Sequence, residues 1–463
     1  MYNNLLISLI SLIFKSFLSI GVFFILAHIL PVDEYGAVSL AYTLAIIFSA
    51  ISEYGYNFLI LKEINANRIE NVIWKILFQK LLLSLFVSMI VIAYCYLMFY
   101  ETKNFYTILL IALSGIFFSF ATFGSAAIKA KNIFIDESLI YGLQLGVLFS
   151  LMVVLYVSER LSAETFALAL LFSRICSAIF SLWRLYIRFE FSMKMLDTLA
   201  IEQKKIFKDG SMYGLHVIFA IAYFQIDSQI IAYYGGEEFI GLYQNTLRFI
   251  VIGVMISEIL QQVILPSLAK SYMNNTEQYS KLIKLSINIQ ASIMIPYVVI
   301  LTVFDSEIVA FLYGENYLSV SKYVWAIILV AFMRSLGLVY GVSLGLSDRP
   351  ILRILSVLSV LLISVALNFS LIPIYGYEVG FYVQVLVHII LNSIYIYYNY
   401  KFIGSTNFGT LALFSSVIIV FLSYSSFIGN TQPKFLLLLV PVFLSISIYY
   451  FKLFRREVLV YDN

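Results

Sequence analysis

Long hydrophobic runs, separated by short polar or charged segments, make up most of the 463-residue chain. A helix rises about 1.5 Å per residue, so a run of about 20 residues crosses the roughly 30 Å hydrocarbon core of a membrane. The pattern predicts an all-α polytopic membrane protein with about fourteen transmembrane helices. The approximate bounds of the runs are 5–30, 36–60, 76–98, 105–128, 138–157, 165–187, 211–234, 240–264, 282–304, 323–346, 352–372, 378–400, 409–427 and 435–453.

The stretch 216–262 joins two of these runs through a tight Gly235-Gly236 turn, and it contains charges where lipid would make them costly. On each helix, polar residues recur at spacings of three or four positions and therefore share one face. Such a face must contact protein or a water-filled cavity. The first face holds His216, Ala220, Tyr223 and Asp227, and the second holds Gln244, Arg248, Val251, Met255, Glu258 and Gln262.

A weak internal repeat relates the two halves of the chain. A shift of 205 positions places Gly36 on Gly241 and Ser52-Glu53 on Ser257-Glu258, and a shift of 217 places Gly124 on Gly341. Two similar halves with a binding site between them are the usual build of a transporter. We expect pseudo-symmetric six-helix lobes around a central cavity. The expected parts are an N-terminal lobe at 1–187, a cytoplasmic linker at 188–209, a C-terminal lobe at 210–401, and two further helices with a cytoplasmic tail at 402–463.

The composition agrees with a membrane protein, because 62% of the residues are hydrophobic and 12% are charged. In soluble proteins, roughly 45–50% of the residues are apolar and about 25% are charged. Cys95 and Cys176 both lie in apolar runs, so we expect no disulfide, no metal site and no cofactor. The first run has no basic segment before it and is long enough to span, so we interpret it as a helix rather than a cleavable signal.

The distribution of Lys and Arg predicts the orientation. With a cytoplasmic N-terminus, the outer loops hold only Lys103, Arg160, Lys322 and Lys434, and the cytoplasmic loops hold most of the others. This positive-inside bias places both termini in the cytoplasm. The longest outer connection, 305–322, is predicted to form a short interfacial helix.

Four basic residues fall deep inside predicted runs. A cavity lined by them favours an anionic head-group, and Arg suits phosphate because its planar fork donates two hydrogen bonds together. Lys80 and Arg184 lie within about one turn of a cytoplasmic end, so we expect their side chains to extend to the interface. The four candidates for binding the substrate are Lys15, Arg174, Arg248 and Arg334.

The acidic residues and histidines of these runs are candidates for a gate or for ion coupling, each with a simpler alternative. Asp227 and Arg248 lie at similar depth on adjacent helices, so a structural ion pair is as good an interpretation as cavity exposure. Glu53 and Glu258 form either a cytoplasmic gate or local pairs with lysines. His216 and His388 titrate near neutral pH when unperturbed, but a packing role is the simpler reading for each.

Four segments resemble the polysaccharide exporters of the MOP superfamily, most closely the Wzx-type O-antigen flippases. They are LPVDEYGAVSLAYTLAIIFSAISEYGYN, FQIDSQIIAYYGGEEFIGLYQNTLRFIV, IVAFLYGENYLSVSKYVWAIILVAF and NFSLIPIYGYEVGFYVQVLVHII. The resemblance implies a flippase of the bacterial inner membrane for undecaprenyl-pyrophosphate-linked oligosaccharide, with two six-helix lobes. Lys15 stands where many relatives place a basic residue. Expected partners are this substrate, membrane lipids, and a polymerase with its chain-length regulator, but no nucleic acid.

Two other functions compete with this interpretation. A membrane polysaccharide polymerase would be expected to carry a large outer loop, and the longest here is 305–322. A MATE-like multidrug exporter of the same superfamily would favour an acidic cavity for cationic drugs, whereas this one counts more basic groups. The chain contains no Gly-Lys pair, so no P-loop can drive it with ATP. We therefore expect a transporter and not an enzyme.

Overall fold

The computed structural model describes residues 20–64, 69–131, 133–189, 199–274, 276–347, 349–404 and 439–462. All regular structure in these ranges is helical, and it divides into two compact units, Met1–Gly241 and Leu242–Asn463. The first unit contains the short helix Ile20–Ile29, α2 (Val32–Glu53), α3 (Tyr56–Ile64), α4 (Ile69–Phe99), α5 (Phe105–Ala130), α6 (Phe134–Val157), α7 (Ala163–Arg188) and α8 (Leu199–Tyr233). From the start of α9 (Glu237–Asn274), the chain passes into the second unit, with α10 (Thr276–Val303), α11 (Asp305–Tyr313), η2 (Glu315–Tyr323), α12 (Val324–Leu346), α13 (Pro350–Tyr375), α14 (Val379–Ile403) and α16 (Leu439–Asp462).

Eleven helices of the described residues are long and apolar enough to cross a membrane. They correspond to the second to twelfth runs predicted from the sequence, from Val32–Ile60 to Val379–Ile403. The first and thirteenth runs lie mostly or entirely outside the described residues, and α16 covers much of the fourteenth. The all-α membrane fold is confirmed, while the total of fourteen spans stays a prediction.

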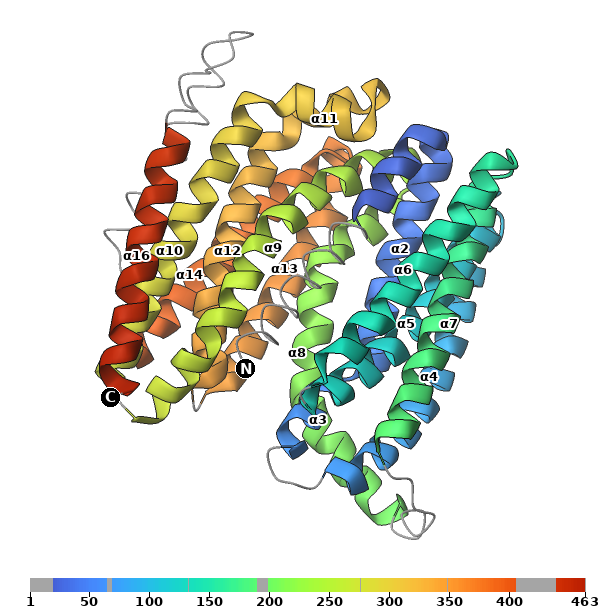
Figure 1. The fold of residues 1–463 in the computed structure, drawn as a ribbon. Helices are drawn as coiled ribbons and strands as arrows, with labels where there is room; N and C mark the ends of the chain where they lie inside the picture. The colour runs from blue at the N-terminus through green and yellow to red at the C-terminus, as the bar shows by residue number, and fades with distance from the viewer. Residues whose placement is uncertain are drawn as a thin grey trace. The chain divides into compact units, whose positions relative to one another are not determined.

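In the first unit, α5 packs between α2 and α7, and small residues let the helices approach closely (Figure 1). A Cβ atom on Gly115 would collide with the backbone of Ala45 on α2, and one on Gly124 would collide with Ser181 on α7. Close approach through small residues replaces the hydrophobic driving force that is absent between helices in lipid. The close packing of α5 against α7 therefore requires a residue without a side chain at Gly124.

The second predicted run, 36–60, is not one continuous helix. α2 ends at Glu53, Tyr54 and Gly55 adopt positive φ angles of 46° and 74°, and α3 begins at Tyr56. The break packs against α8, where a Cβ on Gly55 would lie 2.5 Å from the backbone nitrogen of Gly214. Because Gly55 and Gly214 have no side chains, the backbone of the α2–α3 break and the backbone of α8 can approach closely.

In the second unit, α10 packs against α12 and α16, and α14 packs against α12 and α13 (Figure 1). Ser447 on α16 donates a hydrogen bond to Ser292 on α10 over 2.8 Å. Helix α11 confirms the short helix predicted for the outer connection, and it packs against η2. Phe311 of α11 is 82% exposed, as expected for a helix that lies at an interface.

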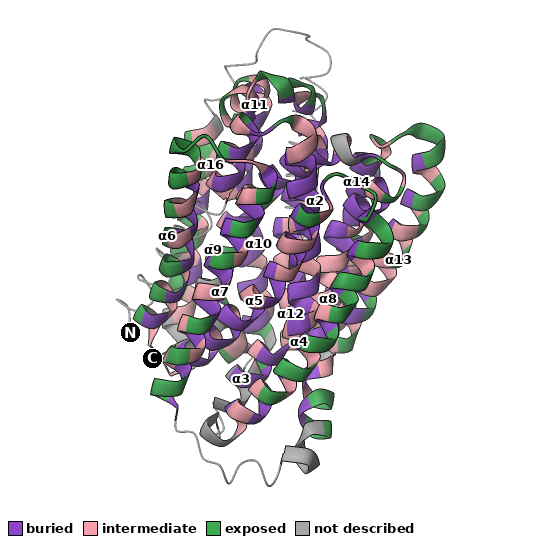
Figure 2. Ribbon diagram, turned by 90° about the vertical axis from the view of Figure 1, so that its right-hand side faces the viewer, coloured by how far each residue is buried: buried purple, intermediate pink, exposed green. Residues whose placement is uncertain are grey.

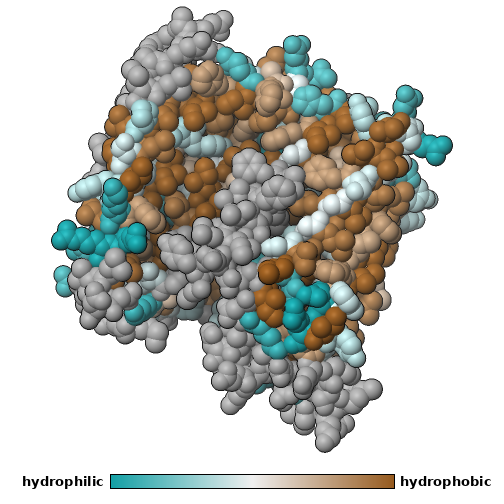
Figure 3. All heavy atoms as spheres, viewed as in Figure 1, coloured by the Kyte–Doolittle hydropathy of each residue, from teal (hydrophilic) through white to brown (hydrophobic). Residues whose placement is uncertain are grey.

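Hydrophobic side chains cover the outward sides of many helices. Helix α4 alone exposes Leu85, Phe86, Met89 and Leu97, whereas most of α2 is buried (Figure 2). On the face drawn in Figure 3, hydrophobic residues cover the flanks and the hydrophilic ones gather mainly near helix ends. Apolar surface of this extent indicates contact with lipid rather than with water.

The compact units do not divide where the sequence places its linker. Of the predicted linker 188–209, residues 190–198 lie outside the described ranges, and α8 already begins at Leu199. Helix α8 packs against α2, α3 and α4, so it groups with the first unit although its span was assigned to the second lobe. The duplication into two six-helix lobes stays a prediction.

Candidate substrate and coupling residues

Lys80 of α4 is completely buried, which makes the expectation that it extends to the interface wrong. Its Nζ donates hydrogen bonds to the carbonyl oxygen of Ser52 over 3.0 Å and to the hydroxyl of Ser119 over 2.9 Å. Helix α4 begins at Ile69, seven residues before the predicted run, so Lys80 lies deeper than its distance from position 76 suggests. The side chain therefore joins α4 to α2 and α5.

The Lys80 ammonium lies within a cluster of oxygen atoms. The Ser52 hydroxyl is 2.6 Å from that of Ser84 and 2.9 Å from that of Ser119. Half-buried Glu53 interacts electrostatically with Lys80, while the choice between a gate and local pairing for Glu53 stays a prediction. Lys80 is thus one electrostatic partner of Glu53.

Arg174 of α7 is buried and held from three sides. Its Nη1 donates to the Ser114 hydroxyl over 2.8 Å, and its guanidinium lies 5.2 Å from the Tyr42 ring centroid and 5.0 Å from that of Phe118. Cation–π contacts strengthen when water is absent. The structure thus gives Arg174 a packing role between α2, α5 and α7, and its proposed contact with substrate stays a prediction.

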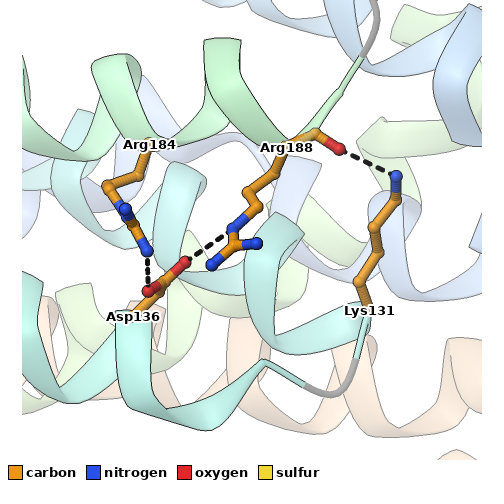
Figure 4. Close-up of polar contacts among 4 residues, drawn as sticks. All are labelled: Lys131, Asp136, Arg184 and Arg188. Atoms are coloured by element: carbon orange, nitrogen blue, oxygen red, sulfur yellow. Dashed lines mark hydrogen bonds and ion pairs between the residues drawn. The ribbon is translucent and has the colours of Figure 1, made fainter.

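Arg184 also differs from its expected role, because it pairs with buried Asp136 in the first turn of α6 (Figure 4). Arg188 donates from Nε to the same carboxylate over 3.0 Å, and Lys131 donates to the Arg188 carbonyl oxygen over 2.9 Å. A carboxylate near a helix N-terminus is further stabilised by the helix dipole. This cluster fixes the end of α7 to the start of α6.

Two candidates of the first unit lie on α8. Asp227 is buried, His216 is half-buried, and each has an interacting partner. Near Asp227, the Gln229 amide donates to the Thr43 hydroxyl over 2.5 Å, which ties α8 to α2. The proposed pair between Asp227 and Arg248 stays a prediction, as does a coupling role for either. Lys15 lies outside the described residues.

In the second unit, buried Arg248 of α9 donates from Nη1 to the Asn245 side-chain oxygen over 2.6 Å. The Asn245 carbonyl oxygen accepts a hydrogen bond from the hydroxyl of Tyr313 on α11 over 3.1 Å. One end of the guanidinium is therefore held by its own helix.

Arg334 of α12 brings two of the other candidates together. Its charge interacts with Glu258 on α9 and with His388 on α14. His388 is completely buried, and its Nδ1 donates to the Gln384 carbonyl oxygen over 2.8 Å. Glu258 is exposed and Arg334 is half-buried. Arg334 thus interacts electrostatically with residues of two other helices.

The two Ser-Glu pairs of the repeat make a related contact. In the first unit Lys80 donates to the Ser52 carbonyl oxygen from the next long helix, and in the second Gln290 of α10 donates to the Ser257 carbonyl oxygen over 3.4 Å. Gln290 also donates to Gln261 over 3.1 Å. The donor is charged in one unit and neutral in the other. The duplication of the two halves stays a prediction.

Among the described residues, no group of three or more His, Cys, Asp or Glu side chains is placed to hold a metal ion. Charged groups inside membrane-spanning helices generally mark transport pathways.

The sequence decides the family. The family model described as "Polysaccharide biosynthesis protein" matches residues 25–322, which is more than half of the chain. The chain belongs to this polysaccharide biosynthesis protein family. The resemblance drawn from the sequence motifs is confirmed at the level of the family. A search of curated proteins finds no match.

Solved structures show that this polysaccharide biosynthesis protein has the fold of MOP-superfamily transporters. The lipid II flippase MurJ in an inward closed conformation gives a TM-score of 0.67 at 14% identity, over 97% of this chain and 99% of that chain. An inward-facing multidrug resistance MATE family transporter gives a TM-score of 0.62 at 14% identity, over 90% of this chain and 99% of that chain. Identity this low shows the fold alone.

Lys80 is the candidate that sequence reasoning missed. A helix of 31 residues exceeds what a membrane needs, so the hydrophobic run alone does not locate the membrane boundary along α4. The available signal was periodic: Lys80, Ser84 and Ser88 follow at spacings of four on one helix face. A helix face that carries Lys80 and two serines is predicted to contact other helices rather than lipid.

Proposed function

We propose that this protein is a flippase that moves an undecaprenyl-pyrophosphate-linked oligosaccharide, such as an O-antigen repeat unit, from the cytoplasmic to the periplasmic leaflet by alternating access. The observation that carries the proposal is the match to the polysaccharide biosynthesis family over residues 25–322. A protein named as a lipid II flippase has the same fold, which supports a lipid-linked substrate. The role proposed is transport and not catalysis.

Basic groups of both units are proposed to bind the pyrophosphate: Lys15, Arg174, Arg248 and Arg334. Arg248 is the strongest of these, because Asn245 holds one end of its guanidinium and a fixed planar fork loses little entropy when it binds two phosphate oxygens. Arg174 is the weakest, since Ser114 and two aromatic rings already surround it.

Coupling is proposed for the acidic and histidine residues of the same helices. Glu258 and His388 both interact with Arg334, so binding an anion at Arg334 would change the electrostatic environment of both. Asp227 and His216 are proposed to act from α8. We place the protein in the bacterial inner membrane with both termini cytoplasmic, working with a polymerase and a chain-length regulator.

Complementation of a flippase-deficient strain tests this function. We expect expression of the chain to restore surface polysaccharide and to remove the accumulated lipid-linked intermediate. The fold shared with multidrug resistance MATE transporters supports a second candidate, export of cationic drugs. Restored drug resistance without restored polysaccharide would favour that candidate and overturn the proposal.

A further inference from the structure

The Lys80 ammonium lies at the end of a broken membrane helix. Helix α2 stops at Glu53 and α3 starts at Tyr56, although both belong to the apolar stretch Val32–Ile60. The last four carbonyl groups of a helix lack partners within it, and the helix dipole makes this end negative. In transporters, such C-terminal ends of discontinuous helices coordinate cations. The Ser52 carbonyl oxygen is one of these groups, and Lys80 donates to it.

The groups around Nζ are the kind that bind a hard cation. Lys80 donates to the Ser52 carbonyl and to the Ser119 hydroxyl, and the Ser52 and Ser84 hydroxyls continue the hydrogen-bonded cluster. Glu53 supplies the opposite charge. Hard cations prefer such carbonyl, hydroxyl and carboxylate oxygens. The Phe120 ring, 4.9 Å from Nζ, adds a cation–π contact.

The contact of Ser52 with charged Lys80 can be compared with the contact of Ser257 with neutral Gln290 in the second unit. Ser257 and Glu258 occupy the related positions, yet α9 runs unbroken through them from Glu237 to Asn274. There the donor to the serine carbonyl is the neutral amide of Gln290. The sequence explains the difference, since Tyr54-Gly55 corresponds to Ile259-Leu260 at a shift of 205 and the second pair has no glycine. A cation is present where the helix is broken and absent from this contact where it is continuous.

We propose that the Lys80 ammonium is a tethered cation that occupies a monovalent-cation site at the α2–α3 break. A covalently attached cation cannot dissociate during a transport cycle. The site therefore holds the break in place and does not couple transport to a diffusing ion. The inference goes beyond the proposed function, and it holds for any transported substrate.

Removing the tethered charge provides the test. In Lys80→Ala, the oxygen cluster and Glu53 remain while the ammonium is lost, so we expect the thermal unfolding temperature to fall by several degrees. Sodium chloride or methylammonium chloride should recover about half of this loss or more, because a ligand that binds only the folded state stabilises it by mass action. Choline chloride at equal ionic strength should have no such effect, and the wild type should not distinguish the three salts.

Two variants serve as controls. Gln290→Ala removes the related donor in the second unit, and we expect a lower unfolding temperature without a difference between the salts. Lys80→Ala combined with Glu53→Gln removes the opposite charge, and the response to sodium and methylammonium should be lost. Both measurements use purified full-length protein and no transport substrate, so their failure would leave the proposed function untouched.

The proposal is overturned if Lys80→Ala responds equally to all three salts, or if Lys80→Met is as stable as the wild type. If Lys80→Ala does not accumulate, Lys80→Ser replaces it, since the added hydroxyl supplies a further oxygen ligand. Failure of both variants to accumulate in cells grown in high sodium would also contradict the proposal, because a diffusible cation should then occupy the site.

Discussion

The Nζ atom of Lys80 lies 3.0 Å from the carbonyl oxygen of Ser52, one residue before the end of α2. At the related position of the other unit, the Gln290 amide nitrogen lies 3.4 Å from the carbonyl oxygen of Ser257, inside a continuous helix. The two units thus share a contact between a long side chain and a serine carbonyl, but they differ in its charge. In the first unit the contact lies at a helix break, and in the second it lies inside an intact helix.

The backbone crossing between Gly55 and α8 predicts a large effect of a small substitution. Gly55→Ala would place a Cβ 2.5 Å from the Gly214 nitrogen, at a φ of 74° that L residues rarely adopt. We expect a loss of about 2–4 kcal/mol in unfolding free energy, from strain and overpacking together. Gly142→Ala is the control, since nothing lies within 4 Å of its added methyl group. Thermal unfolding that fails to separate the two variants would contradict the crossing.

Asp136 predicts a second effect on stability. Its carboxylate is buried and pairs with both Arg184 and Arg188. Asp136→Asn should cost about 2 kcal/mol or more, because it leaves a half-buried arginine without its counter-charge. Asp33→Asn removes the exposed pair with Lys103 and should cost less than about 1 kcal/mol. Equal unfolding temperatures for the two variants would show that the Asp136 cluster does not hold α6 to α7.

The fold could be predicted from the sequence more fully than the site. The lengths of the hydrophobic runs located every span from the second to the twelfth. Backbone N–H and C=O groups in lipid must hydrogen-bond within the segment, so an apolar run of this length forms a helix. The break at Tyr54-Gly55 was missed, since a run of apolar residues has the same appearance whether or not the helix is continuous. The contact of Lys80 with Ser52 joins positions 28 apart, and no local pattern predicts which helices come together.

The charged candidates illustrate the same limit. Their presence inside spans was evident from the sequence, but which charges interact depends on tertiary packing. Arg334 interacts with Glu258 and His388 from two other helices. The sequence pattern did not predict that these three residues interact. Arg184 was expected at the interface and instead meets Asp136, whose place in the first turn of α6 depends on where that helix begins.

The ion pair between Lys322 and Glu378 predicts a dependence on pH. The hydrogen bond from Lys322 lowers the pKa of Glu378 below its usual value of about 4.5. A lowered pKa in the folded state adds stability above the unfolded pKa, and this is lost as the pH falls through the folded value. Glu378→Gln should therefore be less stable than the wild type at neutral pH, by less than about 1 kcal/mol for an exposed pair. The difference should disappear in acid, and a difference that grows below pH 4.5 would contradict the assignment.

Arg248 carries the clearest prediction for binding. Asn245 holds one end of the Arg248 guanidinium and so orients the fork that is proposed to bind the pyrophosphate. Arg248→Ala should therefore reduce transport strongly while the protein still reaches the membrane. Loss of a charge-assisted hydrogen bond costs about 1.5–3 kcal/mol, which corresponds to roughly a tenfold to hundredfold weaker interaction. Arg248→Lys should retain part of the activity, since it keeps the charge but loses the fork. Full transport by Arg248→Ala in a complemented strain would remove this residue from the site.

Translocation by the purified protein in liposomes tests the central claim most directly. Undecaprenyl-pyrophosphate-linked oligosaccharide is placed in both leaflets, and its accessibility to an added sugar-modifying enzyme is followed over time. We predict that the wild type makes the inner-leaflet pool accessible, and that empty liposomes and Arg248→Ala do not. Equal accessibility in wild-type and protein-free liposomes, with saturable uptake of a cationic drug by the wild type, would contradict the flippase account.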